Sequence, residues 1–533
     1  MSTTPQFPTP SDSILGARIA RLESQVDAQR KQLASQQSEL DYARLKIQVL
    51  EERLRKQRVE RYGAKSETLS DLQLELLDRE PGVSREEVEA ESGREPLAAH
   101  PLRPEGNTAK TPRRQHPGRN ELPAHLERVD EIVVGTPEQC ICSQCGAETN
   151  VIGYEASEAL DVRPAEYFVR VVKREKRACK RCAEQGVWTA PVPERIAAKS
   201  VLSDNVIVDL LVRKYCDSLP LYRQQATMRR DAAIEIALST LDDAVLRAGE
   251  LLTPIAAAMK HELLSGTYIQ ADETPVGVQM HDQRGRNHLG YLWQYGAPGK
   301  GVVFDFRMGR DRDGPRSFLG NFGGLLQTDG YQAYDKVGGP GMVHAACLSH
   351  ARRKHVDAVK VNTKDGESAH VVALMDELFS IDREAREQSL SLAERDHLRQ
   401  KRVPALLEKL HTHVLAIQKT ALPKSTAGQA AHYTLSLWKR LTLFLEYPEL
   451  ELSNNLAENS MRPVAIGRKN WLHLGSKEAG PKIAAIFSSV ESCRRLGVPI
   501  RKYLADVLPG LANRSIQSLA ELTPTAYAAR MAK

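Results

Sequence analysis

The sequence predicts a multidomain α/β protein in which helical and cysteine-rich segments precede a mixed β-sheet flanked by helices. The chain of 533 residues is too long for a single hydrophobic core, because domains usually hold about 150 residues. A heptad repeat lies near the N-terminus, and after Gly266 the pattern changes to three strand-like segments, a short helix and a fourth strand. That order is typical of the start of a ribonuclease-H-like fold.

Two aspartates lie on the strand-like segments. TYIQADETPVGVQM, HLGYLWQYG and GVVFDFR precede a short helix around GPRSFLGNF, and the fourth strand lies in GLLQTDGYQAYDKV. Asp272 is within the first strand and Asp329 is at the end of the fourth, and these strands are neighbours in a ribonuclease-H-like fold. The two carboxylates can therefore bracket a hard divalent cation such as Mg²⁺ or Mn²⁺, which prefers oxygen ligands.

A third carboxylate, Glu458, lies in the basic segment LSNNLAENSMRPVAIGRKNWL. We expect it to complete a metal site with Asp272 and Asp329, because two ions about 4 Å apart stabilise both the attacking and the leaving oxygen of a phosphoryl displacement. The neighbouring cations are expected to hold the phosphates of DNA. These cations are Arg462, Arg468 and Lys469.

Other roles are open for the same segment. Asn455 and Glu458 can form a helix-capping pair, and Glu458 with Arg462 has the spacing of a helical ion pair. Trp471 can stack on an unpaired base near the cleaved end, or it can belong to the core.

The charge balance agrees with an anionic partner but does not prove one. The formal net charge is +6, with 27% charged residues. The start of the chain lacks a basic segment followed by an apolar one, and no stretch approaches the roughly 20 apolar residues that span a bilayer. We expect a cytoplasmic protein without a membrane partner.

Residues 14–62 carry a coiled-coil pattern. Apolar residues recur every seven positions at Ile19, Val26, Leu33, Leu40, Ile47 and Leu54, and Leu22, Ala43 and Leu50 fill intervening positions. Glutamines at Gln29, Gln36 and Gln57 predict a weak zipper. We expect a homo-oligomer, and the alternative is a helix that packs within its own subunit.

Residues 63–125 are predicted to be a linker, since they are rich in Pro, Gly, Glu and Arg and lack apolar periodicity. Residues 126–195 form a predicted zinc module, because two CxxC pairs supply the four thiolates of a closed structural Zn²⁺ site. The pairs are Cys142 with Cys145 and Cys179 with Cys182; Cys140 can substitute for Cys142, and unligated cysteines are the alternative. Basic residues around the second pair suggest DNA contact.

Residues 200–262 are predicted to contain short helices joined by turns. A helix-turn-helix that places one helix in the major groove uses such pieces, and a plain helical connector explains the pattern almost as well. The predicted core follows at 263–475, with a helical insertion at about 356–450 and a C-terminal helical region at 476–533.

The segment Cys347-x-x-His350 opens a basic helix. Its cysteine and histidine can be half of a metal site, but two ligands are not a site, and packing between sheet and helix is the alternative. The basic residues that follow are candidates for DNA contact. They are Arg352, Arg353 and Lys354.

Together these segments resemble the large transposases of the insertion-sequence 66 family. The resemblance covers most of the chain and rests on RYGAKSETL, the two CxxC pairs, KYCDSLPLYRQQ, ADETPVGV, TDGYQAYD, CLSHARRKH and NNLAENSMRPVAIGRKNWL. It implies that Asp272, Asp329 and Glu458 are an Asp-Asp-Glu catalytic triad. It also implies that the N-terminal modules bind terminal inverted repeats, and it leaves open whether other proteins of the element assist.

The chain departs from the family pattern at several positions. Ser453 replaces an aspartate before the two asparagines, and Leu348, Ser349 and His355 alter the CxxHARRKF pattern. Ala233 stands where the helical module has a turn glycine, which argues against a helix-turn-helix because alanine disfavours a positive φ.

The function expected from these features is DNA transposition: 3′-end cleavage by metal-activated water, followed by attack of the freed 3′-OH on target DNA. One rival is a nuclease that hydrolyses without joining. Another is an inactive DNA-binding regulator derived from a transposase, against which the presence of all three acids argues.

Overall fold

The computed structural model describes residues 12–62, 166–178, 187–280, 286–362 and 365–532, together with isolated positions between 132 and 148. The chain divides into two compact units, residues 1–100 with 174–533, and residues 101–173. The linker and the four predicted zinc ligands lie outside the described residues: Cys142, Cys145, Cys179 and Cys182. β1 (Lys176–Ala178) lies just before the second cysteine pair and β2 (Val187–Thr189) lies after it, and the two strands form a two-stranded antiparallel sheet.

The predicted N-terminal helix is present as α1 (Asp12–Tyr62), which has 51 residues. Its heptad residues are exposed in the single chain, for example Ile19 at 54% and Leu54 at 64%. A partner helix would bury such a row of apolar side chains. Self-association through α1 therefore stays a prediction.

Three helices precede the sheet: α4 (Asp204–Tyr215), α5 (Leu221–Ala232) and α6 (Leu238–Leu264). Ala233 ends α5 in the left-handed conformation, with φ 53° and ψ 30°, so the positive φ that alanine was expected to disfavour is present at this turn. The helix after that turn, α6, has 27 residues and packs against α14.

The mixed sheet contains the expected succession of three strands, a helix and a fourth strand. Its elements are β3 (Tyr268–Val278), β4 (His288–Gly296), β5 (Val302–Arg307), α7 (Asp313–Leu319), β6 (Leu325–Thr328), η2 (Gln332–Tyr334) and β7 (Val343–Ala346). The strand order is β5-β4-β3-β6-β7. β3 pairs antiparallel with β4, and β4 pairs antiparallel with β5. On the other side of β3, β6 is parallel to β3 and β7 is parallel to β6. The central strand β3 therefore lies between the two kinds of pairing.

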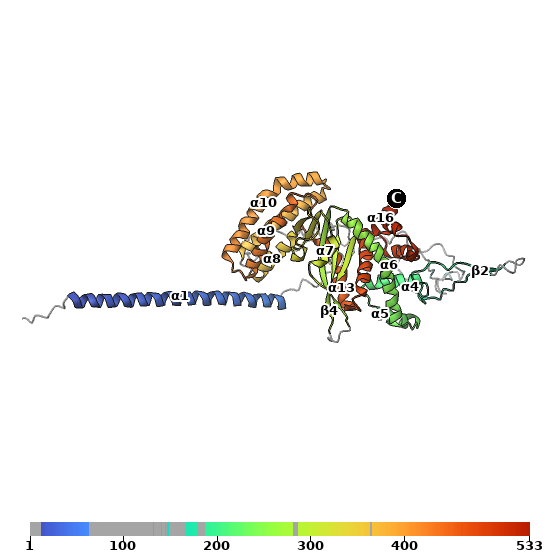
Figure 1. Ribbon diagram of the computed structural model, residues 1–533, viewed down its shortest axis with the longest axis horizontal. Helices are drawn as coiled ribbons and strands as arrows, with labels where there is room; N and C mark the ends of the chain where they lie inside the picture. Colours follow the sequence, from blue (N-terminus) through green and yellow to red (C-terminus); the bar gives the residue numbers. More distant parts are fainter. Residues whose placement is uncertain are drawn as a thin grey trace, which may run out of the picture. The chain divides into compact units, whose positions relative to one another are not determined.

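Helices fill the region between the sheet and Glu458. They are α8 (Leu348–Val361), α9 (Gly366–Glu387), α10 (Leu392–Thr420), α11 (Thr426–Ser436), α12 (Trp438–Leu441) and η3 (Leu443–Leu445). Their apolar faces join β6 and β7 in one core that includes Leu325, Met375 and Leu410. Figure 1 shows α8, α9 and α10 together on one side of the sheet.

The chain then returns to the sheet. The elements are α13 (Asn455–Trp471), β8 (His473–Leu474), α14 (Ala479–Arg495), α15 (Ile500–Val507), η4 (Leu511–Asn513), η5 (Ile516–Leu522) and α16 (Pro524–Met531). β8 pairs with the end of β3, and α13 packs on β3. Helix α14 covers β5, where the hydroxyls of Ser488 and Ser492 accept the backbone N–H groups of Phe304 and Val302, both at 2.8 Å. Glu458 is thus brought back to the first strand of the sheet.

Among the described helices, none combines the length and apolar character that a membrane span requires.

Candidate functional site

Asp272 lies in the middle of β3, on the strand face that packs against α13. Side chains alternate between faces along a strand, so Asp272 shares its face with Gln270 and Thr274. Its Oδ1 accepts the backbone N–H of Glu273 at 2.9 Å. Burial, followed by the negative charges of Glu273, Glu458 and Asp329, raises the pKa of Asp272 well above its usual range. A bound cation would relieve this charge repulsion.

Asp329 directly follows β6, at the start of a tight turn. Its Oδ1 accepts the backbone N–H of Tyr331 at 2.8 Å, and Tyr433 donates its hydroxyl to the Asp329 carbonyl. The next residue, Gly330, has φ +91°, which a side chain would disfavour. The turn therefore fixes Asp329 at the carboxyl end of the strand beside β3.

Glu458 is in the first turn of α13, and its carboxylate lies near both α8 and Asp272. Oε1 is 3.4 Å from His350 Nε2, and Oε2 is 3.4 Å from an Arg353 guanidinium nitrogen. Because Glu458 and Asp329 both raise the pKa of Asp272, the three predicted acids share one electrostatic environment.

The alternative roles for Glu458 have little support in this geometry. The N-cap of α13 is Asn454, which makes no side-chain capping bond and instead donates from Nδ2 to the Ala271 carbonyl at 2.9 Å. In the described structure the Glu458 carboxylate faces His350 and Arg353 rather than Arg462.

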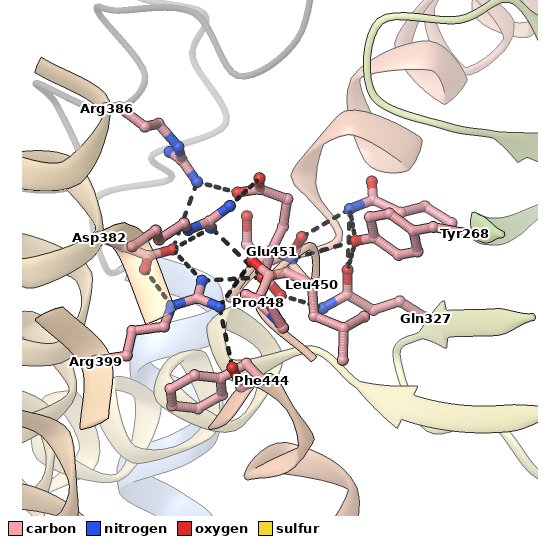
Figure 2. A network of polar contacts seen from close by, with 12 residues as sticks. Tyr268, Gln327, Asp382, Arg386, Arg399, Phe444, Pro448, Leu450 and Glu451 are labelled. Atoms are coloured by element: carbon pink, nitrogen blue, oxygen red, sulfur yellow. Dashed lines mark hydrogen bonds and ion pairs between the residues drawn. The ribbon is translucent and has the colours of Figure 1, made fainter. Parts of the chain in front are cut away.

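A buried hydrogen-bond network joins the three segments that carry the acids (Figure 2). Tyr268 on β3 donates its hydroxyl to Gln327 Oε1 on β6 at 2.5 Å, and Gln270 Nε2 also donates to Gln327 Oε1 at 2.9 Å. Gln270 further donates to the Ser453 carbonyl at 3.1 Å, and Gln327 donates to the Glu451 carbonyl at 2.6 Å. Each glutamine lies two residues before an aspartate, so the network fixes both strands and the start of α13 relative to one another.

Glu273 is an acid near the site that the sequence interpretation overlooked. It points to the opposite strand face from Asp272, where Arg310 donates at 2.9 and 2.6 Å and Tyr334 at 2.8 Å. Burial is the main cause of its raised pKa, and these donors oppose that shift. The carboxylate is satisfied by protein groups, so it supports the site from behind rather than adding an oxygen ligand. The sequence DET, residues 272–274, contained a signal for this arrangement. Neighbouring residues of a strand point to opposite faces, so Glu273 is expected to lie on the face away from Asp272.

The residues expected to contact DNA divide into different environments. Arg352 is buried, and its guanidinium donates to both carboxylate oxygens of Asp376 at 2.5 and 3.1 Å. Because that ion pair joins α8 to α9, Arg352 is not available to DNA, and the expectation for it was wrong. Its neighbours Arg353 and Lys354 are exposed, and Lys354 lies over the Tyr433 ring at 4.6 Å.

Of the three cations on α13, Arg462 is in the middle of the helix and Arg468 and Lys469 are in its last turn. Lys469 is exposed, whereas Arg468 is partly buried and donates to Thr274 Oγ1 at 2.8 Å and to the Pro275 carbonyl at 2.5 Å. Arg462 is partly exposed. Trp471 is partly buried and its ring lies close to Gly467, where an added Cβ would meet Nε1 at 2.4 Å. This contact favours packing on its own helix over base stacking.

The chemistry of the acidic donors fits a hard divalent cation. Asp272, Asp329 and Glu458 offer only carboxylate oxygens, which Mg²⁺ and Mn²⁺ prefer. Glu458 also belongs to a second set of possible ligands, since its carboxylate, the Cys347 Sγ and the His350 imidazole offer ligand atoms within 4.8 Å of one another. In the described structure the ligand atoms of the three acids do not all come that close together.

Three family models match parts of the chain. Residues 199–482 match the model "Transposase IS66 family", which spans all three acids. Residues 139–183 match "zinc-finger binding domain of transposase IS66", which contains all four predicted zinc ligands, and residues 49–130 match "Transposase C of IS166 homeodomain".

Two relatives come from Sinorhizobium fredii (strain NBRC 101917 / NGR234). "Uncharacterized protein y4jD" is 32% identical over 448 residues, covering 80% of this chain and 86% of the relative. "Uncharacterized protein y4hP" is 27% identical over 504 residues, covering 90% of this chain and 87% of the relative. With a zinc-finger domain and a family model that spans more than half of the residues, the chain belongs to the IS66 family of transposases.

Proposed function

We propose that this transposase cleaves the 3′ ends of its element and joins them to target DNA at one metal-dependent site formed by Asp272, Asp329 and Glu458. The observation that carries the proposal is that β6, which ends directly before Asp329, and α13, which carries Glu458, both contact β3, which carries Asp272. Burial and the charges of Glu273, Glu458 and Asp329 raise the pKa of Asp272, in agreement with this proximity. Proteins rarely hold several partly buried carboxylates near one another without a functional reason, because the repulsion costs stability.

The sheet topology supports a ribonuclease-H-like core. Three antiparallel strands are followed by a helix and by two parallel strands on the other side of β3, in the order β5-β4-β3-β6-β7. In this arrangement the middle of β3 and the end of β6 are adjacent, which is where Asp272 and Asp329 lie.

In the proposed mechanism, Asp272 and Asp329 hold the shared cations and Glu458 completes the ligand set. Divalent cations bound there would supply an activated oxygen nucleophile and stabilise the leaving oxygen of the phosphodiester. The exposed cations Arg353, Lys354 and Lys469 would hold DNA phosphates beside the acids. The network around Gln270 and Gln327 keeps the acids in register without a ligand.

The N-terminal segments would supply recognition and assembly. A structural Zn²⁺ on the two CxxC pairs would fold the module that contacts the terminal inverted repeats, together with α4 and α5. Helix α1 would pair with α1 of a second copy through its exposed heptad residues.

The test uses the purified full-length protein, labelled duplexes that carry the element ends, and Mg²⁺. We expect cleaved 3′ ends and joined products, and we expect Asp329→Asn to lose both while end binding stays near the wild-type level. Loss of one carboxylate ligand commonly lowers such activity by about 10³-fold or more.

Duplexes that are already cleaved and carry a free 3′-OH separate transposition from simple hydrolysis. A nuclease would cut intact ends but would not join the prepared ones, and a regulator would bind and do neither. Joining by Asp329→Asn would refute the metal-ligand role of that residue.

A further inference from the structure

The segment Cys347-x-x-His350 contacts the start of α13 at three points. The backbone N–H of Leu348 donates to the Leu452 carbonyl at 2.9 Å, and the backbone N–H of Asn454 donates to Cys347 Sγ at 3.1 Å. One helical turn further on, His350 Nε2 lies 3.4 Å from Glu458 Oε1. Two of these contacts fix the backbone before Glu458, and the third reaches its carboxylate.

The carboxylate of Glu458 lies between two cationic or proton-donating partners on α8. Arg353 is exposed and lies 3.4 Å from Oε2, whereas His350 is partly buried and faces Oε1. The buried Oε1 has no hydrogen-bond partner among the described residues, so the 3.4 Å contact with the His350 imidazole is the polar contact that the structure gives it. Removing the imidazole would take away that contact and leave Oε1 buried with no polar neighbour on α8, which is costly. We expect the carboxylate then to turn toward Arg353, which is exposed and already lies 3.4 Å from Oε2.

The distance between His350 and Glu458 suits a supporting role rather than a closed ion pair. At 3.4 Å it exceeds the 2.7–3.2 Å range of strong N–H···O hydrogen bonds, so Oε1 keeps a lone pair for a cation. The Cys347 thiol is engaged with the backbone, since it also accepts the N–H groups of Ser349 and His350. Its position is therefore explained without a metal.

We propose that His350 is a positioning residue that orients Glu458 toward the cations shared with Asp272 and Asp329. This inference rests on the proposed function of those acids. The inference gives both residues of the Cys347-x-x-His350 motif a role that needs no metal bound to them. The cysteine fixes the start of α13, and the histidine fixes the carboxylate of Glu458. Partners of this kind, which hold a metal-binding carboxylate from behind, typically change metal affinity by about 10–100-fold.

The test measures Mn²⁺ affinity of the full-length protein bound to DNA ends, by electron paramagnetic resonance of free Mn²⁺. We expect His350→Ala to weaken Mn²⁺ binding by about 10-fold or more. His350→Gln should recover most of the affinity, because its amide N–H can reach Glu458. His350→Asn, whose amide is one methylene shorter, should not recover it. Saturating Mn²⁺ should restore part of the cleavage lost by His350→Ala.

The matched control is His355→Gln on the same helix. His355 is fully buried and bonds Thr434 at 3.0 Å, so its substitution tests loss of a buried histidine without touching Glu458. It should lower the melting temperature and leave the Mn²⁺ affinity at the wild-type value. If His350→Ala does not fold, the comparison of His350→Gln with His350→Asn gives the same answer.

Three outcomes separate the possibilities. Wild-type Mn²⁺ affinity in His350→Ala, with binding still lost in Asp272→Asn, would overturn this proposal and leave the proposed function standing. Loss of one bound zinc ion per chain from both Cys347→Ala and His350→Ala, measured by atomic emission, would make these residues metal ligands and would also overturn it. Absence of any Mn²⁺ binding that depends on Asp272 would show that the proposed function itself has failed.

Discussion

Asp272 is partly buried and Asp382 is fully buried, yet burial acts on both carboxyls and their pKa values shift in opposite directions. Burial alone would raise the pKa of Asp382, but Arg399 and Arg395 outweigh it and lower that pKa to about 2. Arg399 donates to both carboxylate oxygens at 2.8 Å, and Arg395 donates at 2.7 Å (Figure 2). Asp272 is surrounded by acids instead, and its pKa is raised.

The difference separates a carboxylate that stabilises the fold from one for which we propose a catalytic role. The Asp382 cluster in the helical region is complete: Arg395 also pairs with Glu451, and Arg399 also donates to three backbone carbonyls. In the Asp272 cluster the cations pair with the neighbouring acids, Arg310 with Glu273 and Arg353 with Glu458, and among the described residues none pairs with Asp272. A divalent cation bound there would supply the missing positive charge, so we expect this cluster to bind one.

The largest effect is expected when the complete cluster is broken. Arg399→Ala would leave Asp382 buried with one fewer cation, and we expect it to lower the free energy of unfolding by about 3–5 kcal/mol. Urea denaturation of the full chain measures this change. The matched control is Arg402→Ala on the same helix, whose pair with Glu384 is 41% and 40% exposed, and it should cost about 0–1 kcal/mol. Equal losses in the two variants would contradict the distinction.

The pH dependence of cation binding sharpens the comparison next. Below the raised pKa of Asp272 a cation must displace a proton, so Mg²⁺ affinity should rise with pH by up to about tenfold per unit and level off above that pKa. Calorimetric titrations at several pH values measure the slope. In Asp272→Asn the slope should shrink along with the affinity; an unchanged slope would assign the proton to another group.

Replacing each aspartate by asparagine should change stability in opposite directions. Asp382 has a lowered pKa, so its contribution is present above pH 3.8 and is lost as pH falls toward 2; Asp382→Asn should destabilise the protein at pH 7. Asp272 has a raised pKa, so its ionisation destabilises the fold as pH rises through that pKa. Asp272→Asn should therefore stabilise the protein by about 0.5–2 kcal/mol while abolishing activity. Thermal melts without divalent cations test both, and destabilisation by both variants would remove the contrast.

The smallest effect concerns the cations that we propose contact DNA. Lys469→Ala should weaken DNA binding about equally for all sequences and reduce the salt dependence by about one counterion, because Lys469 is exposed. Arg352→Ala should leave the salt slope unchanged and lower stability, because Arg352 is paired with Asp376. Fluorescence anisotropy at several salt concentrations distinguishes the two variants. A lower slope for Arg352→Ala would restore it to the DNA-contacting set.

Local patterns predicted the elements of the mixed sheet and the segments that carry the acids, because strand alternation and the change of texture after Gly266 are short-range features. Side-chain environment was harder to predict. In the basic run after His350, nothing local indicates that Arg352 faces inward, since its partner Asp376 is 24 residues away. The ion pairs of Asp382 likewise depend on the packing of α9 against α10.

One overlooked signal was available in the sequence. The tripeptides QAD and QTD place a glutamine two residues before Asp272 and before Asp329, on the same strand face as the aspartate in β3. Their repetition on two strands expected to be neighbours indicates a shared polar network, which the bonds of Gln270 and Gln327 form.

The most direct test is a DNA-bound crystal structure with Mn²⁺, in which anomalous scattering locates the ions. The account predicts manganese at about 2.0–2.2 Å from carboxylate oxygens of Asp272, Asp329 and Glu458, with His350 against the outer side of Glu458. Manganese bound without one of these three carboxylates, while the DNA end is engaged, would contradict it.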